Sequence, residues 1–327
     1  MNVAKSRPRL RRRAVLAGFG AVLAALAVIW FTPSLFMPIA LRVAYLAIGV
    51  RVSSVDVDGR AWEYIETGDP AAQPAILLHG FGTSREAMLG LMPWLAGTHH
   101  VVAPDLPGFG RHAYHVDETH DADFYVREVL RFADALGARQ FDLVGTSMGG
   151  ALAVHLAALH PDRVRRLVLL APAGVQPPVR NAFMQSIDRG ENPLDIASEA
   201  DFDRVVSIVF ERPPPIPWQF RRFAVGEAVR RRPETLRIVE AMRPFLLGGL
   251  EPELPRVQAP TLVVWGDRDR VTDRSMLPVF LAGLPCVTGS LLHDAGHVVF
   301  GDAPDETRRL VAPFLAGPDA AMPCASR

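Results

Sequence analysis

The sequence has little cysteine and no net charge, and each absence excludes a class of protein. Its 327 residues include two cysteines, Cys286 and Cys324, which are too few for a scaffold held together by disulfides. Cys286 lies in an apolar run, so we expect a buried thiol there, although a bridge to Cys324 stays open. The 35 Lys and Arg residues equal the 35 Asp and Glu residues. The chain therefore lacks the one-signed basic surface that nucleic-acid binding needs.

The N-terminal region lacks charge over a long run. Residues 14–31 carry none, whereas residues 5–13 (KSRPRLRRR) carry six positive charges. At a rise of 1.5 Å per residue, a helix over 14–31 would span roughly 27 Å, close to the thickness of the hydrocarbon core of a bilayer. We therefore predict a single transmembrane anchor at 14–31. Positive charge favours the cytoplasmic side, so the basic segment 1–13 is expected in the cytoplasm and the rest of the chain outside it.

Two other interpretations of this region stay open. One is a cleaved signal peptide with ALA at 25–27 as the cleavage site, and the paired arginines at 12–13 weakly resemble a twin-arginine signal. The other is a buried core helix, which so basic a flank disfavours. Apolar sequence continues through 32–50, which favours a retained anchor over an exported chain. We expect 32–50 to be a juxtamembrane segment on the membrane surface, in which Pro33 and Pro38 prevent one uninterrupted helix.

Beyond residue 50, short apolar runs alternate with helical patterns. The predicted strands lie at 52–59, 61–67, 75–79, 100–105, 141–145, 166–172, 259–266 and 286–292. The predicted helices between and after them lie at 85–97, 121–138, 148–161, 273–284 and 304–317. The first two strands form a hairpin around Asp58-Gly59. Most of the later strands lack polar alternation, and strands and helices take turns along the chain. Both features indicate an α/β protein with a mostly parallel, eight-stranded sheet.

A long strand-free stretch separates the strand at 166–172 from the strand at 259–266. Residues 173–258 are too many for a loop and contain numerous arginines, prolines and aromatic residues. We predict that they form a helical cap over the sheet. The core is then made of two parts, 51–172 and 259–317, and we expect the polar tail 318–327 to be disordered.

The segment FDLVGTSMGG (141–150) places a serine between a strand and a helix. A strand that passes directly into a helix must turn so sharply that only small residues fit two positions before and after the serine, here Gly145 and Gly149. Such a turn exposes the Ser147 hydroxyl at the carboxyl edge of the sheet, where α/β proteins bind ligands. A phosphate-binding loop is the alternative, but the segment lacks the lysine that such a loop needs. We therefore predict that Ser147 is a nucleophile.

A serine nucleophile needs a base, and the base needs an acid that orients it. HDAGHVVFGDAP follows the last predicted strand and offers His297, with His293 as a competitor nearer the strand end. The segment VVWGDRDRV ends the preceding strand and offers two candidates for the acid, Asp267 and Asp269. Their spacing along the chain hardly favours one over the other. The chain order Ser, Asp, His is that of the α/β hydrolases rather than that of chymotrypsin or subtilisin.

Acyl transfer also creates an oxyanion, which backbone N–H groups can stabilise. HGFG (79–82) ends the strand at 75–79, and its glycines would let a backbone N–H turn inward. The N–H groups of Phe81 and Met148 are the expected donors. We expect His79 to hold this loop rather than to transfer protons.

At this point the residues resemble the α/β-hydrolase superfamily over about 55–317. The segments LLHGFG, VVAPDLPGFG, LVGTSMGG, LLAPAG, WGDRDRV and DAGH occur in its order and at its usual spacing. The resemblance implies the α/β-hydrolase fold with 173–258 as the cap domain. It also implies Ser147 as nucleophile, Asp269 as acid and His297 as base.

Within the superfamily, VGTSMGG, APAG and the N-terminal apolar segment look most like membrane-anchored monoacylglycerol lipases and related bacterial lipases and esterases. That resemblance implies a serine hydrolase of lipid esters that works through an acyl-enzyme, with no cofactor, no metal and no obligate protein partner. A hydrolase of carbon–carbon bonds in dienone ring-cleavage products stays open, because that family also carries SMGG. A non-catalytic binding protein would not need all three triad candidates.

Two charged segments have a plain explanation. RHAYHVDETHDAD (111–123) concentrates histidines and aspartates, but their spacing matches no closed set of metal ligands, so we expect a solvated loop at the entrance of the site. The arginine-rich stretch 220–237 is expected to be a solvated helix face rather than a lipid-headgroup site.

Overall fold

The computed structural model describes residue 19, residues 22–24 and residues 26–317 of the chain. The predicted basic segment 1–13, much of the predicted anchor and the predicted tail 318–327 lie outside the described residues.

The described N-terminal residues form two helices that meet at a sharp bend. The segments Val22–Phe31 and α2 (Pro33–Ala47) meet at 96°. In the part of the chain that the structure describes, no single helix has both the length and the apolar character to cross a bilayer, although this bent pair reaches that threshold when taken together. Pro33 begins α2, as suits a residue without an N–H. Pro38 lies inside α2 without ending it, so the prediction that it interrupts the helix is wrong.

All eight predicted strands are present in one sheet. They are β1 (Arg51–Val57), β2 (Arg60–Thr67), β3 (Gln73–Leu78), β4 (His99–Pro104), β5 (Phe141–Thr146), β6 (Val164–Leu170), β7 (Thr261–Gly266) and β8 (Val287–Leu292). Their order across the sheet is β1-β2-β4-β3-β5-β6-β7-β8. β1 pairs antiparallel with β2, and β2 with β4, while every pair from β4 to β8 is parallel. The carboxyl ends of β3 and of β5 to β8 therefore meet at one edge.

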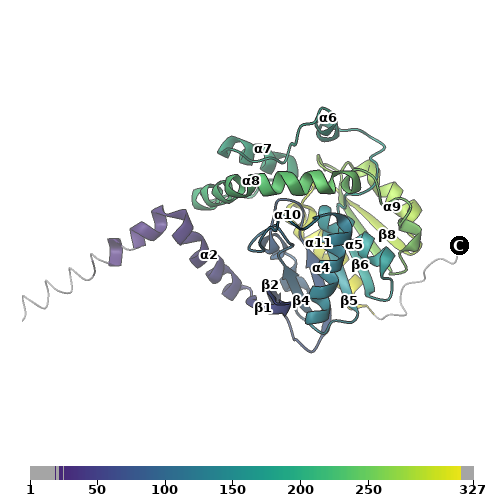
Figure 1. Ribbon diagram of the computed structural model, residues 1–327, viewed down its shortest axis with the longest axis horizontal. Helices are drawn as coiled ribbons and strands as arrows, with labels where there is room; N and C mark the ends of the chain where they lie inside the picture. The colour runs from purple at the N-terminus through teal and green to yellow at the C-terminus, as the bar shows by residue number, and fades with distance from the viewer. Residues whose placement is uncertain (1–18, 20–21, 25, 318–327) are drawn as a thin grey trace, which may run out of the picture.

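Helices cover both faces of the sheet (Figure 1). They are α3 (Met92–Leu95), α4 (Ala122–Ala135), α5 (Met148–Leu159), α9 (Leu277–Gly283), α10 (Val299–Asp302) and α11 (Pro304–Ala316). Two separate clusters of buried apolar side chains fill the space between the helices and the two faces. Asp121 begins α4 by accepting a hydrogen bond from the Phe124 backbone N–H at 2.8 Å.

The predicted helix at 85–97 is wrong in detail. The chain forms a 3₁₀ turn, η1 (Arg85–Met88), and then the short helix α3. Gly90 lies between them, and Pro93, which cannot donate a backbone hydrogen bond, occupies the first turn of α3. The short helix α10 was not predicted at all, because four residues carry no helical periodicity.

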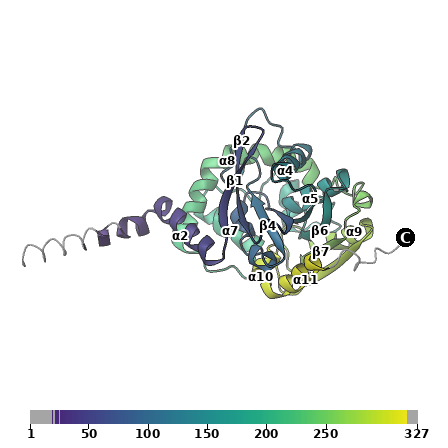
Figure 2. The ribbon, with the colours of Figure 1, turned by 90° about the horizontal axis from the view of Figure 1, so that it is seen from below.

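Residues 173–258 lie between β6 and β7 and form three helices and a 3₁₀ turn. These are α6 (Ala182–Asp188), α7 (Glu199–Val209), α8 (Trp218–Leu246) and η2 (Leu254–Arg256). Figure 1 shows α6, α7 and α8 together on one side of the molecule, and Figure 2 shows α2 next to one end of α8. α2 contacts α8, and the rings of Phe31 and Trp218 lie 6.3 Å apart.

Cys286 lies directly before β8 and is buried, as predicted, but it is disulfide-bonded. The expectation of a thiol is therefore wrong. An apolar neighbourhood in the sequence predicts burial, but spacing along the chain does not reveal how close a second sulfur comes in space. Cys324 lies outside the described residues.

Candidate active site

Ser147 occupies the turn between β5 and α5 in a strained conformation. Its φ is 53° and its ψ is −118°, a region that residues other than glycine rarely adopt. A Cβ on Gly145 would fall under 3.0 Å from the carbonyl oxygen of Gly149, and a Cβ on Gly149 equally close to the carbonyl oxygen of Leu78. Two positions before and after the serine therefore accept only glycine, because the turn brings three backbone segments into contact.

Backbone hydrogen bonds on both sides hold this turn. The Ser147 N–H donates to Leu170 O at 3.1 Å. The Ser147 carbonyl accepts from Ala151 N at 3.0 Å, as in an ordinary helix start, and also from Ala173 N at 3.1 Å. The hydrogen bonds to β6 and to the chain after it hold Ser147 in its strained conformation. Strained residues at functional sites persist when the surrounding structure fixes them in this way.

His297 and Asp269 form a buried pair. Asp269 follows β7 and His297 follows β8, and the distance from His297 Nδ1 to Asp269 Oδ2 is 2.9 Å. The carboxylate of Asp269 also accepts from Thr272 Oγ1 and from Val271 N, both at 2.8 Å. Its side chain is fully buried. A carboxylate that accepts from Nδ1–H fixes the imidazole tautomer in which Nε2 is free to act as a base.

The competing candidates are also paired with each other. The distance from His293 Nδ1 to Asp267 Oδ2 is 3.2 Å, and the His293 side chain is 88% exposed. Asp267 also accepts from the backbone N–H of Asp294 at 2.8 Å. The structure thus brings His297 together with Asp269 in the interior, whereas the partner of Asp267 is a histidine that lies on the surface.

Thr272 lies beside the histidine and lines the cavity into which Ser147 opens. Its hydroxyl lies 3.2 Å from His297 Nδ1. Sequence reasoning missed Thr272. The signal for it was its position three residues after Asp269, on the turn that presents the carboxylate.

The loop after β3 lies beside the serine. A Cβ on Gly80 would be 3.4 Å from Ser147 Cβ and 4.0 Å from its Oγ. Phe81 follows in this loop and lines the cavity together with Met148. Met148 is the first residue of α5, so its N–H has no acceptor within the helix. Both expected donors therefore belong to segments that adjoin the Ser147 side chain.

His79 is buried and uses both ring nitrogens to hold this loop. Nδ1 donates to the carbonyl of Gly80 at 2.9 Å, and Nε2 accepts from the Leu106 backbone N–H at 3.0 Å. Burial lowers the pKa of His79 and keeps the ring neutral, which its accepting Nε2 requires. This geometry suits the expected role of His79 as a holder of the loop.

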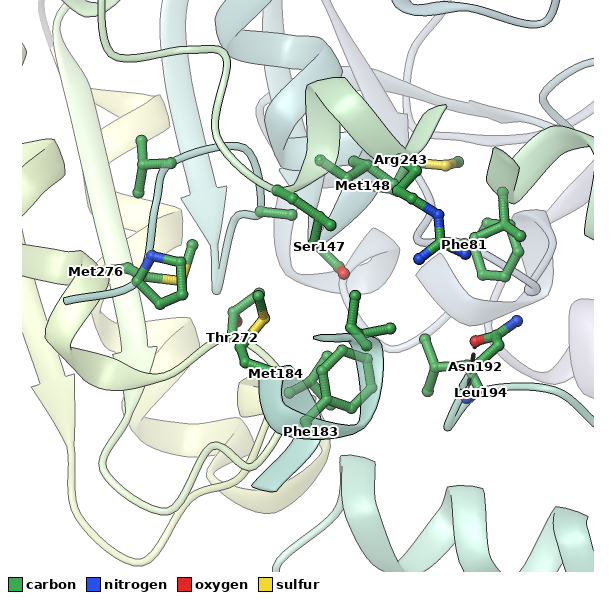
Figure 3. A pocket seen from close by; sticks show the side chains of 18 residues that line it. Phe81, Ser147, Met148, Phe183, Met184, Asn192, Leu194, Arg243, Thr272 and Met276 are labelled. Carbon is green, nitrogen blue, oxygen red and sulfur yellow. Dashed lines mark hydrogen bonds between the residues drawn. The ribbon is translucent and has the colours of Figure 1, made fainter. Parts of the chain in front are cut away.

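Ser147 opens into a cavity of about 90 Å³ (Figure 3). The lining is apolar apart from Ser147, Asn192, Arg243 and Thr272. The apolar residues are Phe81, Met148, Ala173, Val175, Pro177, Phe183, Met184, Ile187, Leu194, Val239, Leu246, Leu247, Val271 and Met276. Many of them belong to 173–258, so the helices between β6 and β7 supply much of the wall.

The described residues contain no group of three or more His, Cys, Asp or Glu side chains arranged to hold a metal ion. In the histidine-rich segment 111–123, the His120 ring stacks on Tyr114 at 4.5 Å and the His112 ring meets Trp62 edge-on at 4.5 Å. These histidines pack against aromatic rings.

Comparison with known proteins gives the same fold. Residues 74–304 match the family model described as alpha/beta hydrolase fold. Lipase 1 of Psychrobacter immobilis is 28% identical over 75% of this chain and 77% of its own length. Monoacylglycerol lipase ABHD6 of Homo sapiens is 28% identical over 82% of this chain and 83% of its own length. The solved structure of a membrane phospholipase A, described as a bacterial virulence factor, is 34% identical, covers 93% of this chain and 98% of its own, and superposes with a TM-score of 0.84.

The family match spans more than half of the chain, and the sheet order and the serine turn agree with it. The chain belongs to the α/β-hydrolase fold family.

Proposed function

We propose that this α/β hydrolase is a serine hydrolase of carboxylic esters whose substrates are lipids such as monoacylglycerols. The observation that carries the proposal is the strained Ser147 at the mouth of an apolar cavity, next to Thr272, which contacts the buried His297–Asp269 pair. The similarity to proteins named lipase and monoacylglycerol lipase supports the lipid substrate.

In the proposed reaction, Nε2 of His297 takes the Ser147 proton while Oγ attacks the ester carbonyl. The N–H groups of Phe81 and Met148 stabilise the oxyanion of the tetrahedral intermediate. The imidazolium, held by Asp269, returns its proton to the leaving alcohol, and an acyl-enzyme remains. Water activated by His297 then adds to the acyl carbon and releases the fatty acid.

We propose 173–258 as the cap of this enzyme, because α6 and α8 contribute the apolar wall where an acyl chain would bind. Burying each methylene of that chain is worth about 0.8 kcal/mol.

We further propose a single-pass anchor at 14–31, with the N-terminus in the cytoplasm and the catalytic domain outside it. Exposed apolar residues continue along the following helix: Leu35, Ile39, Val43 and Leu46. The disulfide at Cys286 suits an oxidising compartment, where disulfides persist. The similarity to a membrane phospholipase A supports a membrane location. Export after signal cleavage is the alternative.

The nucleophile is tested with Ser147→Ala. We expect hydrolysis of p-nitrophenyl butyrate to fall more than about a thousandfold, because the remaining site can only bind and polarise the ester. A fluorophosphonate probe should label the wild-type protein and not the variant. Wild-type-like hydrolysis by a folded Ser147→Ala protein would defeat the proposal.

The acid is tested with a matched pair. Asp269→Asn should lower kcat by about a thousandfold or more, because the amide favours the wrong imidazole tautomer. Asp267→Asn makes the same change near the end of the same strand, but it affects only the pair with the exposed His293. Its kcat should therefore stay close to the wild-type value. Equal losses in the two variants would remove Asp269 from its proposed role.

A further inference from the structure

One cationic side chain enters the apolar cavity. Arg243 lies in the last turn of α8 and is the one charged residue among the described residues that line the cavity around Ser147. The sequence predicts a solvated helix face for 220–237, and Arg243 lies beyond that stretch. The Arg243 side chain is 30% exposed, so its guanidinium reaches both solvent and the cavity, where it could bind an acidic group.

The protein's own carboxylate satisfies only part of this guanidinium. Arg243 Nε donates to Glu240 Oε2 at 3.2 Å, and the Glu240 side chain is 72% exposed. An ion pair with so exposed a partner is weak. Among the described residues no hydrogen bond is recorded for the two terminal nitrogens, and Figure 3 shows them turned toward the interior of the cavity. Those nitrogens form the fork that grips a phosphate or a carboxylate through two parallel hydrogen bonds.

Arg243 and Asn192 lie on the same side of the nucleophile, next to the apolar side chains of Phe81 and Leu194. In Figure 3 the Ser147 hydroxyl lies centrally, with Met276 and Thr272 to one side and Arg243 and Asn192 to the other. Asn192 Oδ1 accepts from the backbone N–H of Leu194 at 3.1 Å, which leaves the amide NH₂ group as its donor. An ester held at Ser147 would thus have one end among apolar side chains and the other near two donors.

We propose that Arg243 binds the phosphate of a glycerophospholipid, so that the enzyme cleaves phospholipids and lysophospholipids in addition to neutral glycerides. This inference rests on the proposed ester hydrolysis at Ser147. The acyl chain occupies the methionine-lined side, and the glycerophosphate is the leaving alcohol on the Arg243 side. A phosphate matches the site because its several acceptor oxygens can engage the guanidinium fork and the Asn192 amide together. The similarity to a membrane phospholipase A agrees with this choice.

The test compares two esters with the same acyl chain. Full-length protein is assayed in detergent micelles on 1-lauroyl-lysophosphatidylglycerol and on 1-lauroylglycerol at equal surface concentration, with released laurate as the common readout. The measured quantity is the ratio of the two kcat/KM values. For Arg243→Met we expect this ratio to fall about ten- to a hundredfold, the range typical of a lost charge-assisted hydrogen bond. Arg243→Lys, which keeps the charge without the fork, should lie between Arg243→Met and wild type.

The control is Arg237→Met. Arg237 lies on the same helix but is exposed and does not line the cavity. Its substitution removes the same charge from α8, so the ratio should stay at the wild-type value. A fall equal to that of Arg243→Met would mean that attraction of the helix to charged micelles, and not phosphate binding in the cavity, sets the ratio.

Other outcomes overturn the inference and leave the proposed function standing. Equal losses on both substrates in Arg243→Met mean that the side chain only packs. An unchanged ratio together with lost inhibition by laurate means that the guanidinium binds the product carboxylate. By contrast, a wild-type protein that cleaves neither lauroyl ester, and is not labelled by a fluorophosphonate, would refute the proposed function itself. Preferred cleavage of a carboxylate-bearing dienone would favour carbon–carbon bond hydrolysis instead.

Discussion

The proposed nucleophile, Ser147, depends on neighbours that lack a side chain. Gly145 and Gly149 face backbone carbonyls at distances that no Cβ tolerates, and Ser147 takes a positive φ between them. The oxygen that is proposed to react is therefore positioned by what is missing on either side of it. Its strain is supported by three backbone hydrogen bonds to the residues around it.

This argument predicts the effect of adding one methyl group. Gly149→Ala places a Cβ under 3.0 Å from the Leu78 and His79 carbonyls, and we expect it to lower the free energy of unfolding by about 1–3 kcal/mol. Gly226→Ala is the control, since Gly226 lies within α8 with nothing within 4 Å of its added Cβ. It should stabilise the protein by up to about 1 kcal/mol. Urea denaturation of both variants provides the measurement, and equal stabilities would contradict the steric account.

At the scale of elements, one side-chain hydrogen bond among the described residues joins α2 to the α/β core. The Tyr45 hydroxyl donates to Glu86 Oε1 at 2.7 Å, and Glu86 belongs to η1, the turn after the loop that holds Phe81. Burial, and the Glu86 carboxylate next to it, raise the pKa of Tyr45, so the phenol keeps its proton and remains a donor. This hydrogen bond is a short polar link between α2 and the turn that follows the Phe81 loop.

Removing this hydroxyl should loosen α2 while the sheet stays intact. In Tyr45→Phe we expect backbone amides of 33–47 to exchange with solvent roughly tenfold faster, because a hydrogen bond to a charged group is worth about 1.5 kcal/mol or more. Leu46→Ala is the control, since the Leu46 side chain is 74% exposed on the same helix. Hydrogen exchange read by mass spectrometry distinguishes them. Unchanged exchange in Tyr45→Phe would show that packing alone holds α2.

The elements also show what the sequence could and could not predict. The eight strands were predictable because buried parallel strands are continuous apolar runs, and the Gly-x-Ser-x-Gly turn named both the strand before Ser147 and the helix after it. The helix at 85–97 failed because its apolar spacing outweighed Gly90 and Pro93 in the prediction. The position of Arg243 in the cavity could not be predicted from the sequence, because only the folded structure shows which arginine of α8 faces inward.

The pairing of the aspartates with the histidines was partly predictable from the sequence. Spacing placed Asp267 and Asp269 at one strand end and His293 and His297 after the next, and left the choice of acid almost open. The structure separates them by burial, because only the Asp269–His297 pair lies in the interior.

For the molecule as a whole, two buried histidines make its stability depend on pH. Burial lowers the pKa of His79, and it lowers that of His112, which meets Trp62 edge-on, to about 4. A histidine whose pKa is lower in the folded state takes up its proton more readily when the chain unfolds. Its contribution is complete above pH about 6.5 and is lost as the pH falls toward 4.

We therefore expect the free energy of unfolding to decrease from pH 6.5 to pH 4.5. We expect His112 to account for about 2 kcal/mol of this decrease. This value is smaller than the full pKa difference implies, because the His112 ring is only partly buried. His112→Phe keeps the contact with Trp62 and should flatten that decrease. His293→Gln changes an exposed ring and should follow the wild-type curve. Guanidinium titrations at several pH values measure this, and parallel curves for wild type and His112→Phe would disprove the role of His112.

The two ends of 173–258 meet at one residue. Gly174 donates its N–H to Leu246 O at 3.1 Å, and its carbonyl accepts from Gly249 N and Leu250 N, both at 3.0 Å. A segment that leaves and re-enters at the same point can be lengthened, shortened or exchanged as a cassette without displacing Ser147, Asp269 or His297. Replacing residues 173–258 between these two joined ends would therefore change which substrates bind, while the proposed catalytic residues keep their positions.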